Sequence, residues 1–307
     1  MSLTVEQASA LSKLALANAP VAMTFVSTLP EGVNRIGQAL PASCSYWKEA
    51  AAGRTFATVA DDHTGCPVGA YTHGVALSGE QAAELQSVVG MMTELKYIKK
   101  EEVPRIPHRS EPMRFAVYSP LAAATFDPDA IIFRGNPRQM MLLSEAARAA
   151  GVFDTASVMG RPACAMVPQT ISAQAGVASV GCIGNRVYTG LDDNELYLTV
   201  PGAAVGRVLE CLETVLAANA ALEQFHRNRV IEESGNRVID YSITRSITQL
   251  PDYPITQLLK RQIRPVARAR AIIGGPDGRS TELPQKITCR GLQNLIGPAP
   301  EELQREL

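Results

Sequence analysis

The chain of 307 residues is poor in several features that define common classes of protein. Aromatic residues make up 5% of it, which argues against a surface on which nucleic-acid bases stack. The formal net charge is −1, so the chain as a whole attracts neither nucleic acid nor an anionic membrane. No apolar run approaches the roughly 18 residues that a membrane-spanning helix needs. We therefore expect a protein with no nucleic-acid partner and no membrane partner.

Familiar catalytic motifs are missing as well. The sequence contains no phosphate-binding loop of the type Gly-x-x-x-x-Gly-Lys-Ser/Thr and no Gly-x-Gly-x-x-Gly after a strand. It contains no Gly-x-Ser-x-Gly, no Cys-x-x-Cys and no His-Glu-x-x-His. Four histidines leave few candidates for a general base. The common nucleotide, hydrolase, thioredoxin and zinc-protease mechanisms therefore have no local support.

The N-terminus and the cysteines predict a cytoplasmic protein. The first ten residues lack a basic segment and contain Glu6, which is typical of a helix start and not of a secretory signal. The six cysteines are then expected to be reduced thiols. In that compartment a group of cysteines more often binds a metal or performs catalysis than forms disulfides.

The hydrophobic pattern predicts an α/β fold, with a mixed α+β arrangement as the alternative. Expected helices cover residues 4–18, 43–51, 79–97, 137–150 and 202–232. Expected strands cover residues 21–27, 55–59, 114–119, 130–133, 187–189 and 196–200. We predict one main domain over residues 1–233, with a mixed sheet and flanking helices, and a C-terminal appendage over residues 234–307. In the appendage, alternation over 237–245 predicts a strand, and the basic segment 257–270 predicts a solvated surface.

One stretch, Ala60–Gly74, has the composition of a site. It concentrates two carboxylates, two histidines and a thiol, which are Asp61, Asp62, His63, His73 and Cys66. Histidine and cysteine together can ligate a metal, and glycines let the backbone approach a ligand closely. The stretch also follows an expected strand, and open α/β sheets place their ligands outside the carboxyl ends of strands.

A second candidate follows the strand expected at 130–133. Asn136 suits the N-cap of a helix and Pro137 suits its first position. Such a helix start can present backbone amides to an anion. We therefore take Arg134, Asn136, Arg138 and His73 as candidate substrate-binding residues. The alternative is an ordinary helix cap with two solvated arginines.

An ordered set of short motifs resembles a known family. The set includes Pro20-Val-Ala-Met-Thr-Phe25, Cys44, Asp61-Asp-His-Thr-Gly-Cys66, Phe126-Asp-Pro-Asp-Ala-Ile-Ile132, Gly135-Asn-Pro137, Cys164, Cys182-Ile-Gly184 and Gly190-Leu-Asp-Asp193. Over roughly residues 10–215 it is similar to the ArCR family of archaea and bacteria, an uncharacterised family known as domain of unknown function 169. The resemblance implies a prokaryotic α/β-type domain whose cysteines match at positions 44, 66, 164 and 182. It implies no activity.

Three hypotheses about function remain open. The first is a metal site, with an iron–sulfur cluster or zinc as cofactor, built from Cys44, Cys66, Cys164 and Cys182. Because these cysteines are far apart in sequence, the fold would have to bring them together from separate elements.

The second hypothesis is a metal-free enzyme in which Cys66 is the nucleophile, His63 or His73 the base, and Asp61 or Asp62 the group that orients the base. The third is a metal-free protein that binds a small anion and keeps its cysteines in the core. In all three the partner is a small molecule, and assembly into a homo-oligomer is left open.

Overall fold

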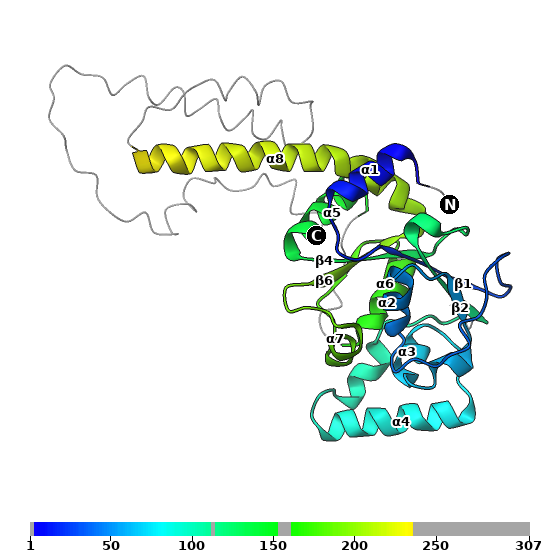
Figure 1. Ribbon diagram of the computed structural model, residues 1–307. Coiled ribbons are helices and arrows are strands. Elements are labelled where there is room, and N and C mark those ends of the chain that lie inside the picture. Colours follow the sequence, from blue (N-terminus) through cyan, green and yellow to red (C-terminus); the bar gives the residue numbers. More distant parts are fainter. Residues whose placement is uncertain (1–2, 112–113, 153–160, 236–307) are drawn as a thin grey trace, which may run out of the picture. The chain divides into compact units, whose positions relative to one another are not determined.

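The computed structural model describes residues 3–111, 114–152 and 161–235. The strand expected at 237–245 and the basic segment 257–270 lie outside these residues. A six-stranded sheet forms the centre of the domain (Figure 1). Its strand order is β2-β3-β1-β4-β6-β5. The strands are β1 (Val21–Val26), β2 (Phe56–Thr58), β3 (Phe115–Pro120), β4 (Ala130–Gly135), β5 (Val177–Ser179) and β6 (Leu196–Pro201).

The predicted mixed α/β class is confirmed. The prediction of a sheet with mixed strand directions is corrected. All pairings between these six strands are antiparallel. Within the described residues, parallel pairing is limited to an isolated bridge between Arg35 and Ala57. The six-stranded sheet is therefore antiparallel and not of mixed direction. The rule that ligands bind at the carboxyl ends of parallel strands does not apply to the stretch Ala60–Gly74, which follows β2.

Successive side chains along each strand point to opposite faces of the sheet, and both faces are buried. Ala22, Val117 and Ile131 pack into one core, together with Phe133, Leu198 and Val200. Their neighbours along the strands pack into a second core, which contains Val21, Met23, Phe25, Tyr118, Ile132 and Tyr197. We call the second side the thiol face, because Cys44 and Cys164 belong to its core.

Three helices cover the face opposite the thiols. They are α1 (Val5–Lys13), α5 (Pro137–Ala149) and α8 (Val205–Gly235). The sequence specifies two of their starts locally, since Thr4 caps α1 and Asn136 caps α5, each in a capping box. The expected helix starts at these two residues are thus confirmed.

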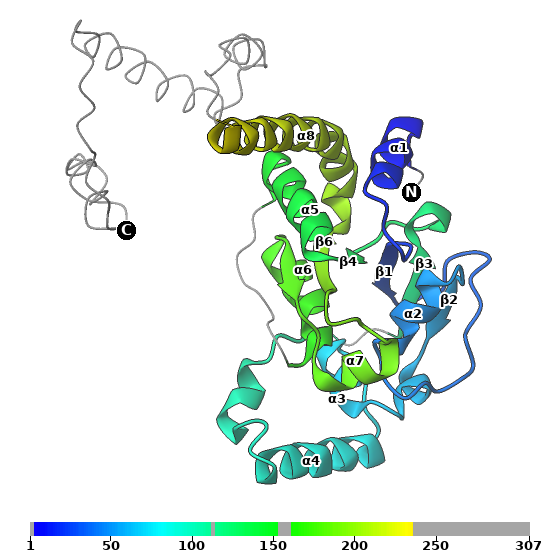
Figure 2. The ribbon, with the colours of Figure 1, turned by 60° about the vertical axis from the view of Figure 1, so that its left-hand side comes forward.

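Four shorter helices cover the thiol face. They are α2 (Ser45–Ala51), α3 (Pro67–Thr72), α6 (Met166–Ala173) and α7 (Ile183–Thr189). Helix α4 (Gly79–Glu94) lies beyond α3, away from the sheet (Figure 2), and Gln81 is its one buried residue. The 3-10 turns are η1 (Ala60–His63), η2 (Lys100–Arg105), η3 (Leu121–Ala123), η4 (Ala163–Ala165) and η5 (Gly202–Ala204).

The strand expected at residues 187–189 is wrong, because those residues end helix α7. Val187 and Tyr188 favour strands, but both side chains are exposed and no neighbouring strand pairs with them. The helix is held instead by its buried side, where the Thr189 hydroxyl donates to the Asn185 carbonyl at 2.7 Å. Gly190 ends it in the left-handed conformation, with φ of 66°.

Candidate cysteine site

The four cysteines singled out by the sequence lie in one region on the thiol face. Cys44, Cys66 and Cys182 occupy the N-cap positions of α2, α3 and α7, and Cys164 lies in η4, just before α6. The Cys44 thiol interacts electrostatically with the thiols of Cys66 and Cys182. The Cys164 thiol interacts with all three others. Four separate elements thus bring the four sulfur atoms into one neighbourhood.

Burial strongly raises the pKa values of two of these thiols. Burial raises the pKa of Cys44 to about 12, although a hydrogen bond with Asn185 acts in the opposite direction. Burial also raises the pKa of Cys164 well above its usual range, and the nearby Cys66 adds to the effect. A hydrogen bond from the Thr72 hydroxyl to Cys164 Sγ, 3.1 Å long, partly offsets the rise. Both thiols therefore hold their protons at neutral pH unless a metal displaces them.

The four cysteines do not form a recognisable site for a single metal ion. Among the residues that the structure describes, no three histidine, cysteine, aspartate or glutamate side chains form a group that could hold a metal ion. One zinc ion needs its thiolates about 2.3 Å away in a tetrahedron. The observed arrangement therefore offers no ready-made site for a single zinc ion.

The side chains of Asp62, His63 and Cys66 are close in sequence, but no hydrogen bond joins one of these side chains to another. The two ring nitrogens of His63 are engaged by hydroxyls, with Nδ1 2.8 Å from Ser43 Oγ and Nε2 2.9 Å from Thr58 Oγ1. The Asp62 carboxylate accepts from the Val59 amide at 2.8 Å. Burial lowers the pKa of His63 to about 4. His63 would have to give up a hydroxyl partner before it could act as a base toward Cys66.

His73 is completely buried, and neither of its ring nitrogens makes a hydrogen bond of ordinary geometry within the described ranges. Its ring meets the edge of Phe25 at 5.8 Å between centroids, and Trp47 lies 6.5 Å away. Burial, with a smaller contribution from His63, lowers the pKa of His73 to about 3. A weaker interaction with the Cys164 backbone acts to raise this pKa. The ring is therefore neutral at physiological pH.

Arg109 lies in the same region as His73. The sequence does not reveal this position. The segment around it contains several prolines and looks like an exposed loop. In the structure the guanidinium stacks on Phe25, with Cζ 4.4 Å from the ring centroid, and its Nε is buried with no partner among the described residues. A strand distant in sequence thus supplies the ring on which Arg109 stacks.

Buried polar atoms without partners are distributed unevenly across the sheet. Within the described residues they belong to Ser45, Trp47, His73, Arg109, Tyr118 and Asn185. All six lie on the thiol side, and the opposite core has none among the side chains described. The Tyr118 hydroxyl, for example, interacts electrostatically with the thiols of Cys164 and Cys44. Its interaction with Thr58 falls outside ordinary hydrogen-bond geometry. Each unpaired buried group costs about 1–3 kcal/mol, so the cost is concentrated around the sulfur atoms.

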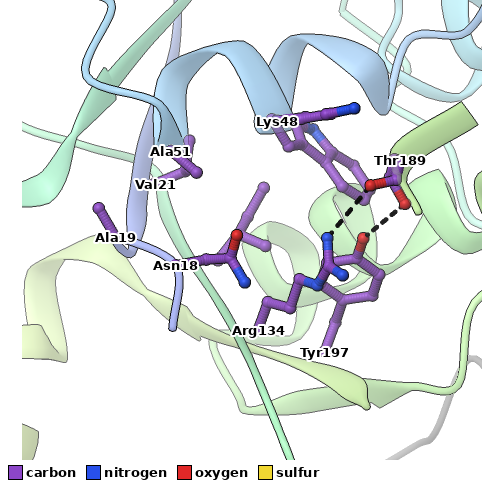
Figure 3. A pocket seen from close by; sticks show the side chains of 10 residues that line it. Asn18, Ala19, Val21, Lys48, Ala51, Arg134, Thr189 and Tyr197 are labelled. Atoms are coloured by element: carbon purple, nitrogen blue, oxygen red, sulfur yellow. Dashed lines mark hydrogen bonds between the residues drawn. The ribbon is translucent and has the colours of Figure 1, made fainter. Parts of the chain in front are cut away.

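The other predicted substrate residues are not brought together with His73. Arg134 donates to Glu195 through Nε at 2.9 Å and through Nη2 at 2.5 Å, and it also donates to the carbonyl of Thr189. It lines a pocket of about 20 Å³, room for one water molecule (Figure 3).

Asn136 and Arg138 line a separate groove of about 380 Å³ on the opposite side of the sheet. There the Asn136 side chain accepts from the Gln139 amide, and Arg138 pairs with Glu223 at 2.5 Å. The side chains around the helix start thus already have partners within the protein.

Among the described helices, none is long and apolar enough to cross a membrane.

Comparison with known proteins shows the family. The uncharacterised ArCR family, domain of unknown function 169, matches residues 11–211, and the chain belongs to it. An uncharacterised protein of Methanocaldococcus jannaschii is 29% identical over 166 residues, which cover 52% of this chain and 70% of the relative. No solved structure matches the chain.

Proposed function

We propose that the protein binds an iron–sulfur cluster through Cys44, Cys66, Cys164 and Cys182. The observation that carries this proposal is the gathering of four thiols from four elements in the same layer as all the unpaired buried polar atoms of the described side chains. Four cysteines are the usual ligand set of [2Fe–2S] and [4Fe–4S] clusters.

The size of the cofactor is the second consideration in this proposal. A cluster places several iron and sulfide atoms between its thiolates, so its ligands lie farther apart than the ligands of one ion. Cys164 interacts electrostatically with the other three thiols, and among the described residues no three ligand side chains form a group that could hold one metal ion. We therefore propose a cofactor larger than a single zinc ion.

The unpaired donors support the same proposal. Trp47 Nε1 and the hydroxyls of Ser45 and Tyr118 are buried without partners in the part of the chain that is described. Hydrogen bonds to the sulfur atoms of a cluster are one of the ways in which a protein sets its reduction potential. A sulfur-rich cofactor in this layer would give these groups acceptors that the protein does not provide.

The test is the metal content of the full chain purified without oxygen. Iron and acid-labile sulfide should be present, with an absorption spectrum in the visible range. Serine in place of Cys44, Cys66, Cys164 or Cys182 should lower iron and sulfide. Cys211→Ser is the matched control, since Cys211 lies in α8 and packs against the opposite core.

Two outcomes would overturn the proposal. One is a preparation without iron and sulfide, or one that holds zinc alone. The other is equal iron content in Cys211→Ser and in the four cysteine variants of the thiol face, because the cluster would then be held elsewhere.

A further inference from the structure

We infer that Arg109 and His73 form a binding site for the carboxylate group of a small molecule, next to the cysteines. The inference deepens the proposed function, because it names the class of molecule that the thiol face receives. Binding of the carboxylate does not require the cluster. Only a reaction of the bound molecule at the cluster would rest on the proposed function.

Arg109 is set apart from most other arginines of the described residues by the absence of an acidic partner. Seven arginines there form ion pairs with carboxylates: Arg35, Arg54, Arg134, Arg138, Arg161, Arg186 and Arg227. Arg109 stacks instead on Phe25, and its Nε–H lies buried without an acceptor within the described ranges. A stacked guanidinium keeps its N–H edge free for a planar two-oxygen group.

His73 supplies the second, independent observation. Its side chain is fully buried, and neither ring nitrogen makes a hydrogen bond of ordinary geometry with the described groups. The backbone of Cys164 interacts with the ring more weakly. It interacts electrostatically with Arg109, and the two side chains contact the same Phe25 ring. A neutral imidazole carries one N–H, so the pair offers a guanidinium fork and one further donor.

The backbone holds the two residues beside each other. The Arg109 amide donates to the Thr72 carbonyl at 3.0 Å, and Thr72 directly precedes His73. At Gly74, with φ of +66°, an added Cβ would lie 2.8 Å from Arg109 Cβ. Glycine thus allows the Arg109 segment to lie directly on the end of α3.

The same contacts place the donors near the sulfur atoms. The Thr72 hydroxyl donates to Cys164 Sγ at 3.1 Å, so one residue contacts both the cysteine and the Arg109 segment. A carboxylate matches the parallel N–H groups of an arginine, and the charge of Arg109 has no carboxylate partner among the described residues. The ligand class is therefore a small carboxylic acid in its ionised form.

Trp47 provides the measurement, because it is the single tryptophan of the chain and lies 6.5 Å from the His73 ring. The full chain is titrated with acetate, and with acetamide as the neutral isostere, at constant ionic strength while tryptophan emission is recorded. Acetate should give a saturable change and acetamide should not. Arg109→Lys keeps the charge but loses the fork, and should weaken acetate binding by about tenfold or more.

The matched control is Arg54→Lys, since Arg54 also lies over a phenylalanine ring, Phe56, at 5.6 Å but is paired with Glu49. It should bind acetate as the unaltered chain does. His73→Gln keeps one amide donor and should weaken binding less than His73→Phe, with circular dichroism used to confirm that both variants are folded. Equal responses to acetate and acetamide, or unchanged acetate binding by Arg109→Lys, would overturn the inference.

Iron and sulfide are measured on the same samples, which separates the two proposals. Acetate binding by a protein that lacks iron would support the carboxylate site and overturn the cluster. Iron held by the four cysteines without a saturable acetate response would support the cluster and overturn the carboxylate site.

Discussion

The hydroxyl of Thr72 donates a hydrogen bond to Sγ of Cys164 at 3.1 Å, although the two residues are 92 positions apart in sequence. Both side chains are buried. The contact joins the end of α3 to η4, and it connects the stretch that begins at Cys66 with the segment that contains Cys164.

Replacing Thr72 with valine removes this hydrogen bond, and the one that the hydroxyl donates to the Gly69 carbonyl at 3.0 Å, while keeping the shape of the side chain. We expect a loss of about 1 kcal/mol in the free energy of unfolding and, for the iron–sulfur cluster that we propose, faster loss of iron to a chelator. Thr72→Ser keeps the hydroxyl and should retain iron better. Urea unfolding and iron release measure the two effects, and valine and serine variants that release iron at the same rate would contradict the expectation.

Two glycines should respond to alanine with opposite signs. At Gly69 an added Cβ would lie 2.2 Å from Ser43 Oγ and 3.1 Å from Cys66 Sγ, so Gly69→Ala should cost roughly 2–3 kcal/mol. At Gly90, inside α4, nothing lies within 4 Å, so Gly90→Ala should add about 1 kcal/mol through helix propensity. Thermal unfolding of the two variants checks the pair, and a neutral Gly69→Ala would mean that α3 moves freely away from Ser43.

The two buried histidines should make the domain less stable in acid. The folded pKa values of His63 and His73 are about 4 and about 3, against an ordinary value of 6.5. Between pH 6.5 and about 4 the unfolded chain therefore binds more protons at these sites than the folded chain does. Stability then falls as pH falls, by at most roughly 1.4 kcal/mol per pH unit for each histidine.

The measurement is the free energy of unfolding in urea at pH 7 and at pH 5. His63→Gln should lose less stability between these values than the unaltered chain, because one of the two sites is gone. His108→Gln, which changes an exposed histidine, is the control and should lose as much as the unaltered chain. A His63→Gln variant with the full loss would assign the acid sensitivity to other groups.

The pair of Arg134 and Glu195 should stabilise the connection between α7 and β6. Each side chain is 17% exposed, and Arg134 also donates to the carbonyls of Thr189 and Gly190. Arg134→Met should lower the free energy of unfolding by about 2 kcal/mol, since it leaves a half-buried carboxylate without its partner.

Arg138→Met is the comparison, because the side chain of Arg138 is 67% exposed, and it should change stability by less than about 0.5 kcal/mol. Equal losses in the two arginine variants would show that burial does not decide the strength of these ion pairs.

Local sequence signals predicted much of the fold. The apolar runs at Val21–Val26 and Ala130–Gly135 are strands, and the cap at Asn136 starts a helix as its side chain predicts. At α7 the local signal failed, because strand-forming residues there are exposed and have no strand beside them. Strand direction was missed for a similar reason, since it depends on connections between elements and not on any one run.

The candidate site could be predicted in part. The sequence singled out the four cysteines and His73, and the structure places all of them on the thiol side. Arg109 and Tyr118 could not be found in this way. Their positions depend on contacts with Phe25 and with the thiols, which come from distant parts of the chain.

The distance along the chain between the first and last of the four cysteines bears on how the protein is made. Cys44 and Cys182 are separated by 138 residues, since 182 − 44 = 138, and each sits on a different helix. While the chain is being synthesised, the first three cysteines are added before the fourth exists. The complete set of ligands is therefore available only after most of the domain has been translated, and loading of a cofactor that needs all four has to follow that step.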